Sequence, residues 1–342
     1  MKRIIPLCLA LIMTVGLLAG CGKQNEQTAS DETRLRVVTT IFPEYDWVRE
    51  ILGDKADNAE VTMLLDNGAD LHSYQPTADD IIKISECDLF IYVGGESDDW
   101  VDDALKNAAN KNMKVINLLE ALGERVKTEE VVEGMQEEDH DHDHDREDTD
   151  EHGDAKEHDH EEEAEYDEHV WLSLKNAQTL CSAISSVLQQ IDPDNKDTYA
   201  ANASAYIKKL SALDADYQAA VNAAACKTVL FGDRFPFRYL AEDYGLRYYA
   251  AFAGCSAESE ASFETISFLA GKVDELNLPC VLTIEGVQHK IAETIVRNTA
   301  EKNQKVLTMD SMQSTTSKDA ANGTTYLSVM ERNLSVLKEA LG

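Results

Sequence analysis

Two histidines of this 342-residue chain stand in short motifs that could hold a divalent metal ion. His72 lies in the run GADLHSYQP, where a glycine and a proline fix a loop directly after an expected strand over 59–65. His169 lies in the run DEHVWLS, just before a helix that Ser173 is expected to cap, and its acidic neighbours can orient the ring. Because imidazole is a common ligand of zinc and related metals, we predict that both rings bind metal.

Six further histidines alternate with acidic residues in a low-complexity segment. They are His140, His142, His144, His152, His158 and His160. This composition cannot build a core, so we expect residues 129–165 to form a disordered loop. Side chains two residues apart face the same side of an extended chain, which lets several imidazoles converge on one ion. We interpret the segment as a low-affinity metal loop beside the main site, dispensable for the fold.

The same segment carries most of the net charge of −33. Residues 129–168 contain 22 Asp plus Glu against two basic residues, so well over half of the acidic excess lies there. Such a surface repels phosphate and attracts cations. We therefore expect no nucleic-acid partner.

The N-terminus predicts export and lipid anchoring. Residues 1–20 combine two basic residues with a short apolar stretch, which is typical of a signal peptide and too short for a comfortable membrane span. The LAGC run ending at Cys21 resembles the bacterial lipobox, whose cysteine is acylated. Residues 21–33 then form a flexible tether. We expect a lipid on Cys21 to anchor the protein to the outer face of the cell membrane.

Apolar strand runs alternate with helical patterns in two series, which predicts an α/β fold with two mainly parallel sheets. The N-terminal lobe is expected over 34–191 and the C-terminal lobe over 226–342. Between them, residues 192–225 contain neither Gly nor Pro after Pro193, and apolar residues recur at helical spacing. We expect one long rigid helix there to join the lobes. Ligands of open α/β sheets bind beyond the carboxyl ends of strands, so the metal cleft is expected between the lobes.

Taken together, these motifs resemble a known family. The two histidine runs, the acidic insertion before the second run, the Met-Asp pair at 309–310 and the TTY run at 324–326 are similar to the ZnuA-like zinc- and manganese-specific solute-binding lipoproteins of ABC importers. The resemblance covers about residues 35–341. It implies that His72, His169 and Asp310 bind the metal, and that the protein is not an enzyme but delivers metal to an ABC transporter permease. We expect a monomer.

The chain departs from the family at the third ligand, which is a histidine or glutamate after the first strand of the second lobe. Arg234 aligns there, and its guanidinium cannot bind a cation, although it could pair with an acidic ligand. Asp233 and Cys255 are the candidate third ligands, and Glu285 is a more distant choice. A thiolate from Cys255 would favour zinc, whereas Asp233 together with Asp310 would suit manganese.

We therefore predict that the protein captures Zn²⁺ as a transported ligand, with Mn²⁺ as the alternative cargo. A zinc-dependent hydrolase is the rival from another class, but no HExxH motif appears. Five cysteines remain beyond the signal peptide and the lipobox, an odd number without a CxxC pair, which leaves disulfide pairing open. They are Cys87, Cys181, Cys226, Cys255 and Cys280.

Overall fold

The computed structural model describes residues 34–136, 165–256, 260–286 and 289–342. The expected signal peptide, the tether with Cys21 and the six histidines of the metal loop lie outside these residues. Within the described ranges, every helix is too short or too polar to span a bilayer. The five cysteines of these ranges are free thiols.

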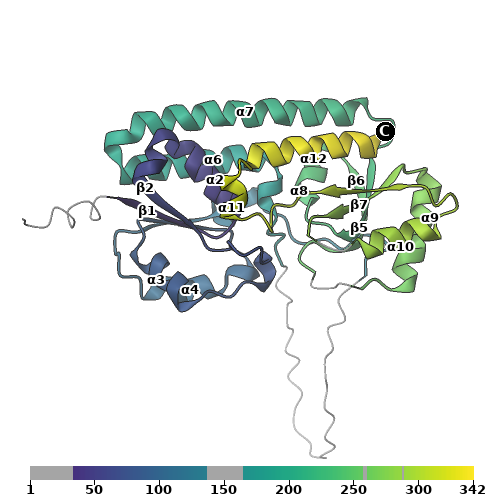
Figure 1. Cartoon of the computed structure of the whole chain (residues 1–342), viewed down its shortest axis with the longest axis horizontal. Helices are drawn as coiled ribbons and strands as arrows, with labels where there is room; N and C mark the ends of the chain where they lie inside the picture. The colour runs from purple at the N-terminus through teal and green to yellow at the C-terminus, as the bar shows by residue number, and fades with distance from the viewer. Residues whose placement is uncertain (1–33, 137–164, 257–259, 287–288) are drawn as a thin grey trace, which may run out of the picture. The chain divides into compact units, whose positions relative to one another are not determined.

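The first lobe is built on a four-stranded sheet in the order β2-β1-β3-β4 (Figure 1). The β1–β3 and β3–β4 pairs are parallel, and Val37, Val38, Leu89, Phe90 and Ile91 of the two central strands are buried. The strands are β1 (Leu35–Thr39), β2 (Ala59–Met63), β3 (Leu89–Tyr92) and β4 (Lys114–Asn117). The helices between and after them are α2 (Phe42–Leu52), α3 (Ala78–Glu86), α4 (Trp100–Lys106) and α5 (Leu118–Leu122).

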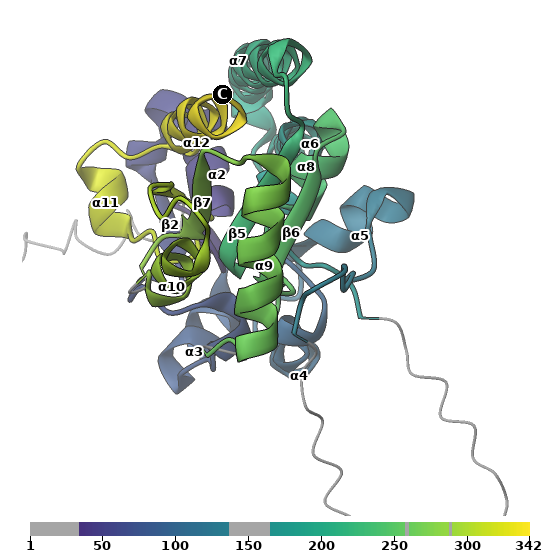
Figure 2. The same ribbon diagram turned by 90° about the vertical axis from the view of Figure 1, so that its right-hand side faces the viewer.

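The second lobe repeats this plan with a sheet in the order β6-β5-β7-β8, whose paired strands all run parallel. Its strands are β5 (Thr228–Arg234), β6 (Arg247–Phe252), β7 (Cys280–Ile284) and β8 (Lys305–Met309). Its helices are α8 (Arg238–Tyr244), α9 (Phe263–Leu276), α10 (Lys290–Asn298) and α11 (Ser317–Ala321). Figure 2 shows α9 and α10 against this sheet, and both helices contact β5.

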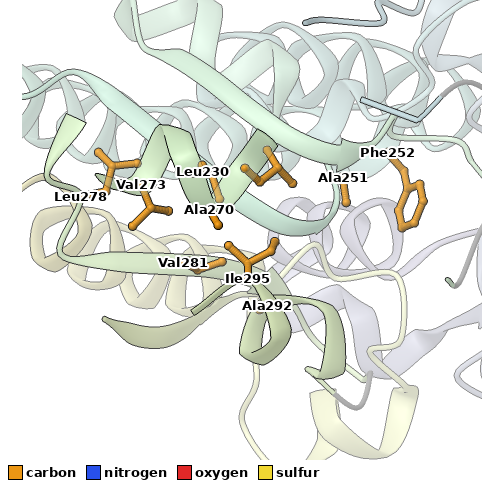
Figure 3. Close-up of a cluster of buried hydrophobic side chains, with 10 residues drawn as sticks. Leu230, Ala251, Phe252, Ala270, Val273, Leu278, Val281, Ala292 and Ile295 are labelled. Carbon is orange, nitrogen blue, oxygen red and sulfur yellow. The ribbon is translucent and has the colours of Figure 1, made fainter. Parts of the chain in front are cut away.

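The core of the second lobe lies between the sheet and these two helices. Leu230 and Val281 of the strands, Val273 of α9, and Ala292 and Ile295 of α10 are at most 1% exposed and gather in one cluster (Figure 3). Burial of such side chains contributes about 25 cal/mol per Å² of apolar surface. The cluster therefore holds the strands of the second sheet against α9 and α10.

Two long helices and a C-terminal helix pack against α2 of the first lobe. Ser173 caps α6 (Leu174–Ile191) by accepting from the Asn176 N–H, as the sequence predicted. The expected joining helix is α7 (Lys196–Ala223), whose 28 residues span about 42 Å. It contacts α2 and α6 of the first lobe and α12 (Tyr326–Leu341), beside which it lies in Figures 1 and 2. The predicted fold, two parallel-sheet lobes joined by a long helix, is confirmed.

A second crossing between the lobes was not predicted. Residues 127–136, here called the strap, start beside the chain that enters α6. Thr128 pairs with Tyr166 in an antiparallel bridge, and the Glu129 N–H donates to the Glu165 carbonyl at 2.8 Å. Backbone hydrogen bonds therefore join the stretch before residues 137–164 to the stretch after them, at residues 128–129 and 165–166.

The far end of the strap lies on the second lobe. The Gln136 N–H donates to the Ala251 carbonyl of β6 at 2.9 Å, and the Gln136 amide oxygen accepts from the Ser262 N–H at 2.8 Å. Gly134 has φ +88°, and a Cβ at that position would lie 2.0 Å from the Phe268 ring, so only glycine allows this approach. The prediction that the disordered loop begins at residue 129 is therefore wrong, because residues 129–136 pack on the second lobe. Their acidic composition resembles that of the neighbouring histidine-rich residues, so composition alone did not separate the two stretches.

Candidate metal centre

His72 and His169 are brought together by two irregular segments of the first lobe. His72 belongs to a short 3-10 turn, Leu71–Ser73, and its N–H is bound by the Asp70 carboxylate at 3.1 Å. His169 directly precedes a second such turn, Val170–Leu172, and is fully buried. The two Nε2 atoms lie 3.3 Å apart, and the rings are tilted by 58°.

The other nitrogen of each ring has an oxygen partner that sets the orientation of the imidazole. His169 Nδ1 lies 2.9 Å from Asp167 Oδ1, and His72 Nδ1 lies 2.9 Å from Ser97 Oγ and 3.3 Å from Glu168 Oε2. When each Nδ1 donates its proton to these oxygens, both Nε2 atoms keep a lone pair that can bind metal. Two nitrogens bound to one tetrahedral zinc at about 2.05 Å lie about 3.3 Å apart, so the rings already have the spacing of a zinc site.

Cys255 completes a group of three. One ligand atom each from His72, His169 and Cys255 lies within 4.8 Å of the others, the only such group of His, Cys, Asp or Glu among the described residues. Cys255 follows β6, and its N–H donates to Glu129 Oε1 of the strap at 2.8 Å. Gly254 lies against the His169 ring, where a Cβ would be 3.1 Å from Nδ1, so a larger residue would push the thiol away.

The thiol of Cys255 is strongly disposed to keep its proton. Burial raises its pKa well above the usual range, and the negative charges of Glu129, Asp167 and Glu168 raise it further. A cation that binds the sulfur must therefore displace this proton, and the positive charge of the metal supplies the driving force.

Asp310 and Asp233 do not belong to the cluster. Asp310 Oδ1 accepts from the Met312 N–H at 2.8 Å and its other oxygen lies 3.7 Å from Arg332, so the carboxylate closes its own turn after β8. Asp233 lies within β5, which extends to Arg234, and its Oδ2 accepts from Thr283 Oγ1 at 2.9 Å. The expectation that Asp310 or Asp233 joins the two histidines is therefore not met in this structure.

Glu285 and His289 also have other partners. Glu285 accepts from the Ser311 N–H and from Ser311 Oγ at 2.6 and 2.7 Å, so it braces the turn after β8. His289 Nδ1 lies 2.9 Å from Thr283 Oγ1. Both residues stabilise the strand ends of the second lobe.

Gln313, which the sequence did not single out, lies beside the histidine pair. The orientation of its amide that fits the surrounding donors and acceptors is the one in which the nitrogen donates to both Asp70 oxygens, at 3.0 and 3.3 Å. The other amide atom, the oxygen in this orientation, is then 3.4 Å from His169 Nε2. A neutral oxygen donor therefore lies beside His169 Nε2. Its sequence signal is weak, because a neutral amide is an uncommon metal ligand and Gln313 stands in no motif of its own.

Arg234 pairs with Asp70 across the lobes, at 2.5 Å. Burial alone would raise the pKa of Asp70, but the charge and the hydrogen bond of Arg234 outweigh it and lower that pKa. The sequence suggested that Arg234 could pair with an acidic ligand, whereas its partner in the structure is Asp70, which was not a predicted ligand.

Two α/β lobes with two imidazoles and a thiol at facing loops define a two-lobed protein of the solute-binding class. The model of the ZnuA family, described as zinc-uptake complex component A, periplasmic, matches residues 37–340, and the chain belongs to this family. The predicted family is confirmed.

Individual relatives agree with this assignment. The zinc-binding lipoprotein AdcA of Streptococcus pneumoniae is 32% identical over 339 residues, which cover 99% of this chain and 61% of AdcA, so the chain spans about three fifths of that relative. The high-affinity zinc uptake system protein ZnuA of Bacillus subtilis is 31% identical, with 95% of this chain and 94% of that protein covered.

Solved structures show the same fold. The Zn(II)-bound ZnuA-like domain of Streptococcus pneumoniae AdcA superposes with a TM-score of 0.65 at 29% identity, covering 90% of this chain and 99% of the domain. The metal-dependent lipoprotein YcdH of Bacillus subtilis gives a TM-score of 0.69 at 27% identity, with 90% and 99% covered.

Proposed function

We propose that this protein captures Zn²⁺ outside the cytoplasm and delivers it to the permease of an ABC importer. The observation that carries the proposal is the 3.3 Å separation of His72 Nε2 and His169 Nε2, with the thiol of Cys255 in the same cluster. The printed names of the relatives, a zinc-binding lipoprotein and a zinc uptake protein, support the same cargo.

The donor set favours zinc over manganese. Two imidazoles and one thiolate suit a borderline ion, whereas manganese prefers carboxylate and water oxygens. The proposed ligands are His72, His169 and Cys255, with the amide oxygen of Gln313 at the fourth position. Asp310 and Asp233, which would make the site rich in carboxylates, are not among the proposed ligands, since each lies outside the group of three and accepts a hydrogen bond from another residue.

Capture follows from the arrangement of these residues. Asp167 and Ser97 hold the two imidazoles in the orientation needed for binding, so little ordering remains when the ion arrives. The thiol proton of Cys255 leaves as the ion binds. Because the histidines come from the first lobe and the cysteine from the second, the bound ion ties the two lobes together, and the permease can recognise the joined surface.

Catalysis is the weaker reading of the same residues. A hydrolytic zinc needs a bound water beside a general base. The side chain next to His169 Nε2 is Gln313, at 3.4 Å, and its neutral amide cannot act as a base.

The remaining parts of the proposal concern the membrane and the metal loop. Residues 1–20 would be removed as a signal peptide, a lipid on Cys21 would anchor residues 21–33 to the outer face of the membrane, and the six histidines between 140 and 160 would collect metal at low affinity. These residues lie outside the described ranges, and their sequence pattern is what supports the proposal.

The test of the cleft is the double variant His72→Ala with His169→Ala, and His289→Ala is the matched control. Zinc sites of this kind are worth about 10–16 kcal/mol, so losing two of the ligands should weaken binding by more than about 1,000-fold. Affinity is measured by competition with a chelator strong enough to mask weak sites. Unchanged tight affinity in the double variant would refute the cleft. Deletion of the gene should abolish high-affinity zinc uptake, and normal uptake would refute delivery.

A further inference from the structure

The ion pair between Arg234 and Asp70 stands at the edge of the metal cluster. Arg234 is the last residue of β5 in the second lobe, and Asp70 precedes the turn that carries His72. The second guanidinium nitrogen of Arg234 faces the Ser256 carbonyl at 3.4 Å, next to Cys255. The two charged side chains are only 19% and 25% exposed, so solvent screens their attraction incompletely.

Asp70 lies close enough to become a metal ligand. Its Oδ1 is 4.0 Å from His72 Nε2, the nitrogen that faces His169. Two atoms bound to one ion at about 2.1 Å are at most about 4.2 Å apart, so Oδ1 is within reach of an ion held by His72. Even so, Asp70 is not a member of the group whose ligand atoms lie within 4.8 Å of one another. Asp70 Oδ1 is therefore close to the metal-binding nitrogen of His72 but outside the group of three.

Three contacts hold the carboxylate away from the ion. Oδ1 accepts the His72 N–H at 3.1 Å, Oδ2 accepts from Arg234, and the Gln313 amide nitrogen donates to both oxygens. Of the three donors only Arg234 carries charge, and charge-assisted hydrogen bonds are about twice as strong as neutral ones. Arg234 is therefore the main restraint on Asp70, and it also neutralises the one carboxylate that a hard cation would seek.

We propose that Arg234 is a specificity-determining residue that withholds Asp70 from metal coordination and thereby selects zinc over manganese. This inference rests on the proposed function of the site. With Asp70 withheld, the ion meets two imidazoles, one thiolate and one neutral amide, which is a tetrahedral set for a borderline ion. With Asp70 released, the site gains an anionic oxygen and a fifth ligand, and both changes favour manganese, which prefers oxygen donors and higher coordination numbers.

The test uses the full chain with Arg234→Gln, which removes the charge but keeps a polar side chain. Mn²⁺ and Zn²⁺ affinities are measured separately by chelator competition. We expect Mn²⁺ to bind about 10- to 100-fold more tightly than to wild type, the range that partners of metal ligands typically control, and to gain more affinity than Zn²⁺, so that the preference for zinc falls. Arg234→Lys, which keeps the positive charge beside Asp70, should retain most of the wild-type selectivity.

Asp70 must carry the change if the proposal is right. The double variant Arg234→Gln with Asp70→Asn should lose the gain in Mn²⁺ affinity, and Asp70→Asn alone should show no gain. In Co²⁺-loaded protein, the visible bands of Arg234→Gln should weaken relative to wild type, because Co²⁺ absorbs less strongly as its coordination number rises. A purely structural role of Arg234 would not produce this spectral change.

The outcomes separate this inference from the proposed function. Wild-type protein that failed to bind Zn²⁺ tightly would overturn the zinc site itself. Wild-type protein that binds Zn²⁺ tightly, together with an Arg234→Gln variant of unchanged Mn²⁺ affinity, would overturn only the role of Arg234. A gain in Mn²⁺ affinity that persists in the double variant would also overturn it, since Asp70 would then not be the ligand.

Discussion

The substitution Cys255→Ser tests the most specific feature of the proposed ligand set through its pH dependence. In the metal-free protein the buried thiol stays protonated through the range from pH 7.5 to 9, because burial and the charges of Glu129, Asp167 and Glu168 raise its pKa beyond that range. In this interval the thiol is the ligand that must lose a proton when zinc binds. The free protein therefore holds one more proton than the complex, and binding tightens as pH rises.

The magnitude follows from counting that proton. One proton released per ion changes the binding constant tenfold per pH unit, so affinity should rise about 30-fold between pH 7.5 and 9. A serine hydroxyl keeps its proton in both states. Cys255→Ser should therefore bind more weakly at every pH and show almost no slope, so its deficit relative to wild type should widen about 30-fold across the same interval.

The assay is zinc competition with a chelator whose own pH dependence is known, measured at four pH values. Cys226→Ser, a partly buried thiol outside the cluster, is the matched control and should behave as wild type. Co²⁺ loading should give an ultraviolet thiolate charge-transfer band that Cys255→Ser lacks. A flat pH profile in wild type, or equal slopes in wild type and Cys255→Ser, would refute the assignment of the thiol as a ligand.

Two further predictions concern the acidic loop and the buried core of the first lobe. Deleting 137–163 should leave the tight zinc affinity within about threefold, because the three ligands and their partners lie outside it, and a large loss in chelator competition would contradict this. Burial and the charge of Asp98 raise the pKa of Glu44 to about 8, so the folded protein keeps a proton that the unfolded chain releases near pH 4.5. Glu44 therefore lowers stability as pH rises from about 4.5 to 8, by roughly 3 kcal/mol at pH 7. Urea unfolding of Glu44→Gln should show a flatter pH profile than wild type, and an identical profile would refute this account.

The fold was predictable because its signals are local and repeated. Strands such as β3 are continuous apolar runs, and α7 has neither glycine nor proline while Tyr199, Tyr206, Leu210 and Tyr217 recur on its buried face. The spacing of the apolar residues indicates these helices and strands without knowledge of the tertiary contacts, because each type of element buries side chains at its own regular spacing.

The site was predictable only in part. His72 and His169 stand in motifs whose neighbours reveal their orientation, and both reach the cluster. Asp310 lies outside the group of three, because a position at a strand end indicates the edge of the sheet but not the direction of the side chain, which here turns back onto its own backbone. The choice between Asp233 and Cys255 depended on where β5 ends, and the strand continues past Asp233.

The strap has a consequence for how the insertion can vary. An outer strand such as β6 exposes unpaired backbone groups that can recruit another chain, and the strap occupies one of these acceptors through the N–H of Gln136. Because both flanks of residues 137–164 are fastened at the base, lengthening that stretch adds only a small entropy cost. Insertions of different length and histidine content could thus be exchanged at this point without uncovering the outer strand or disturbing the backbone N–H of Cys255, which donates to Glu129.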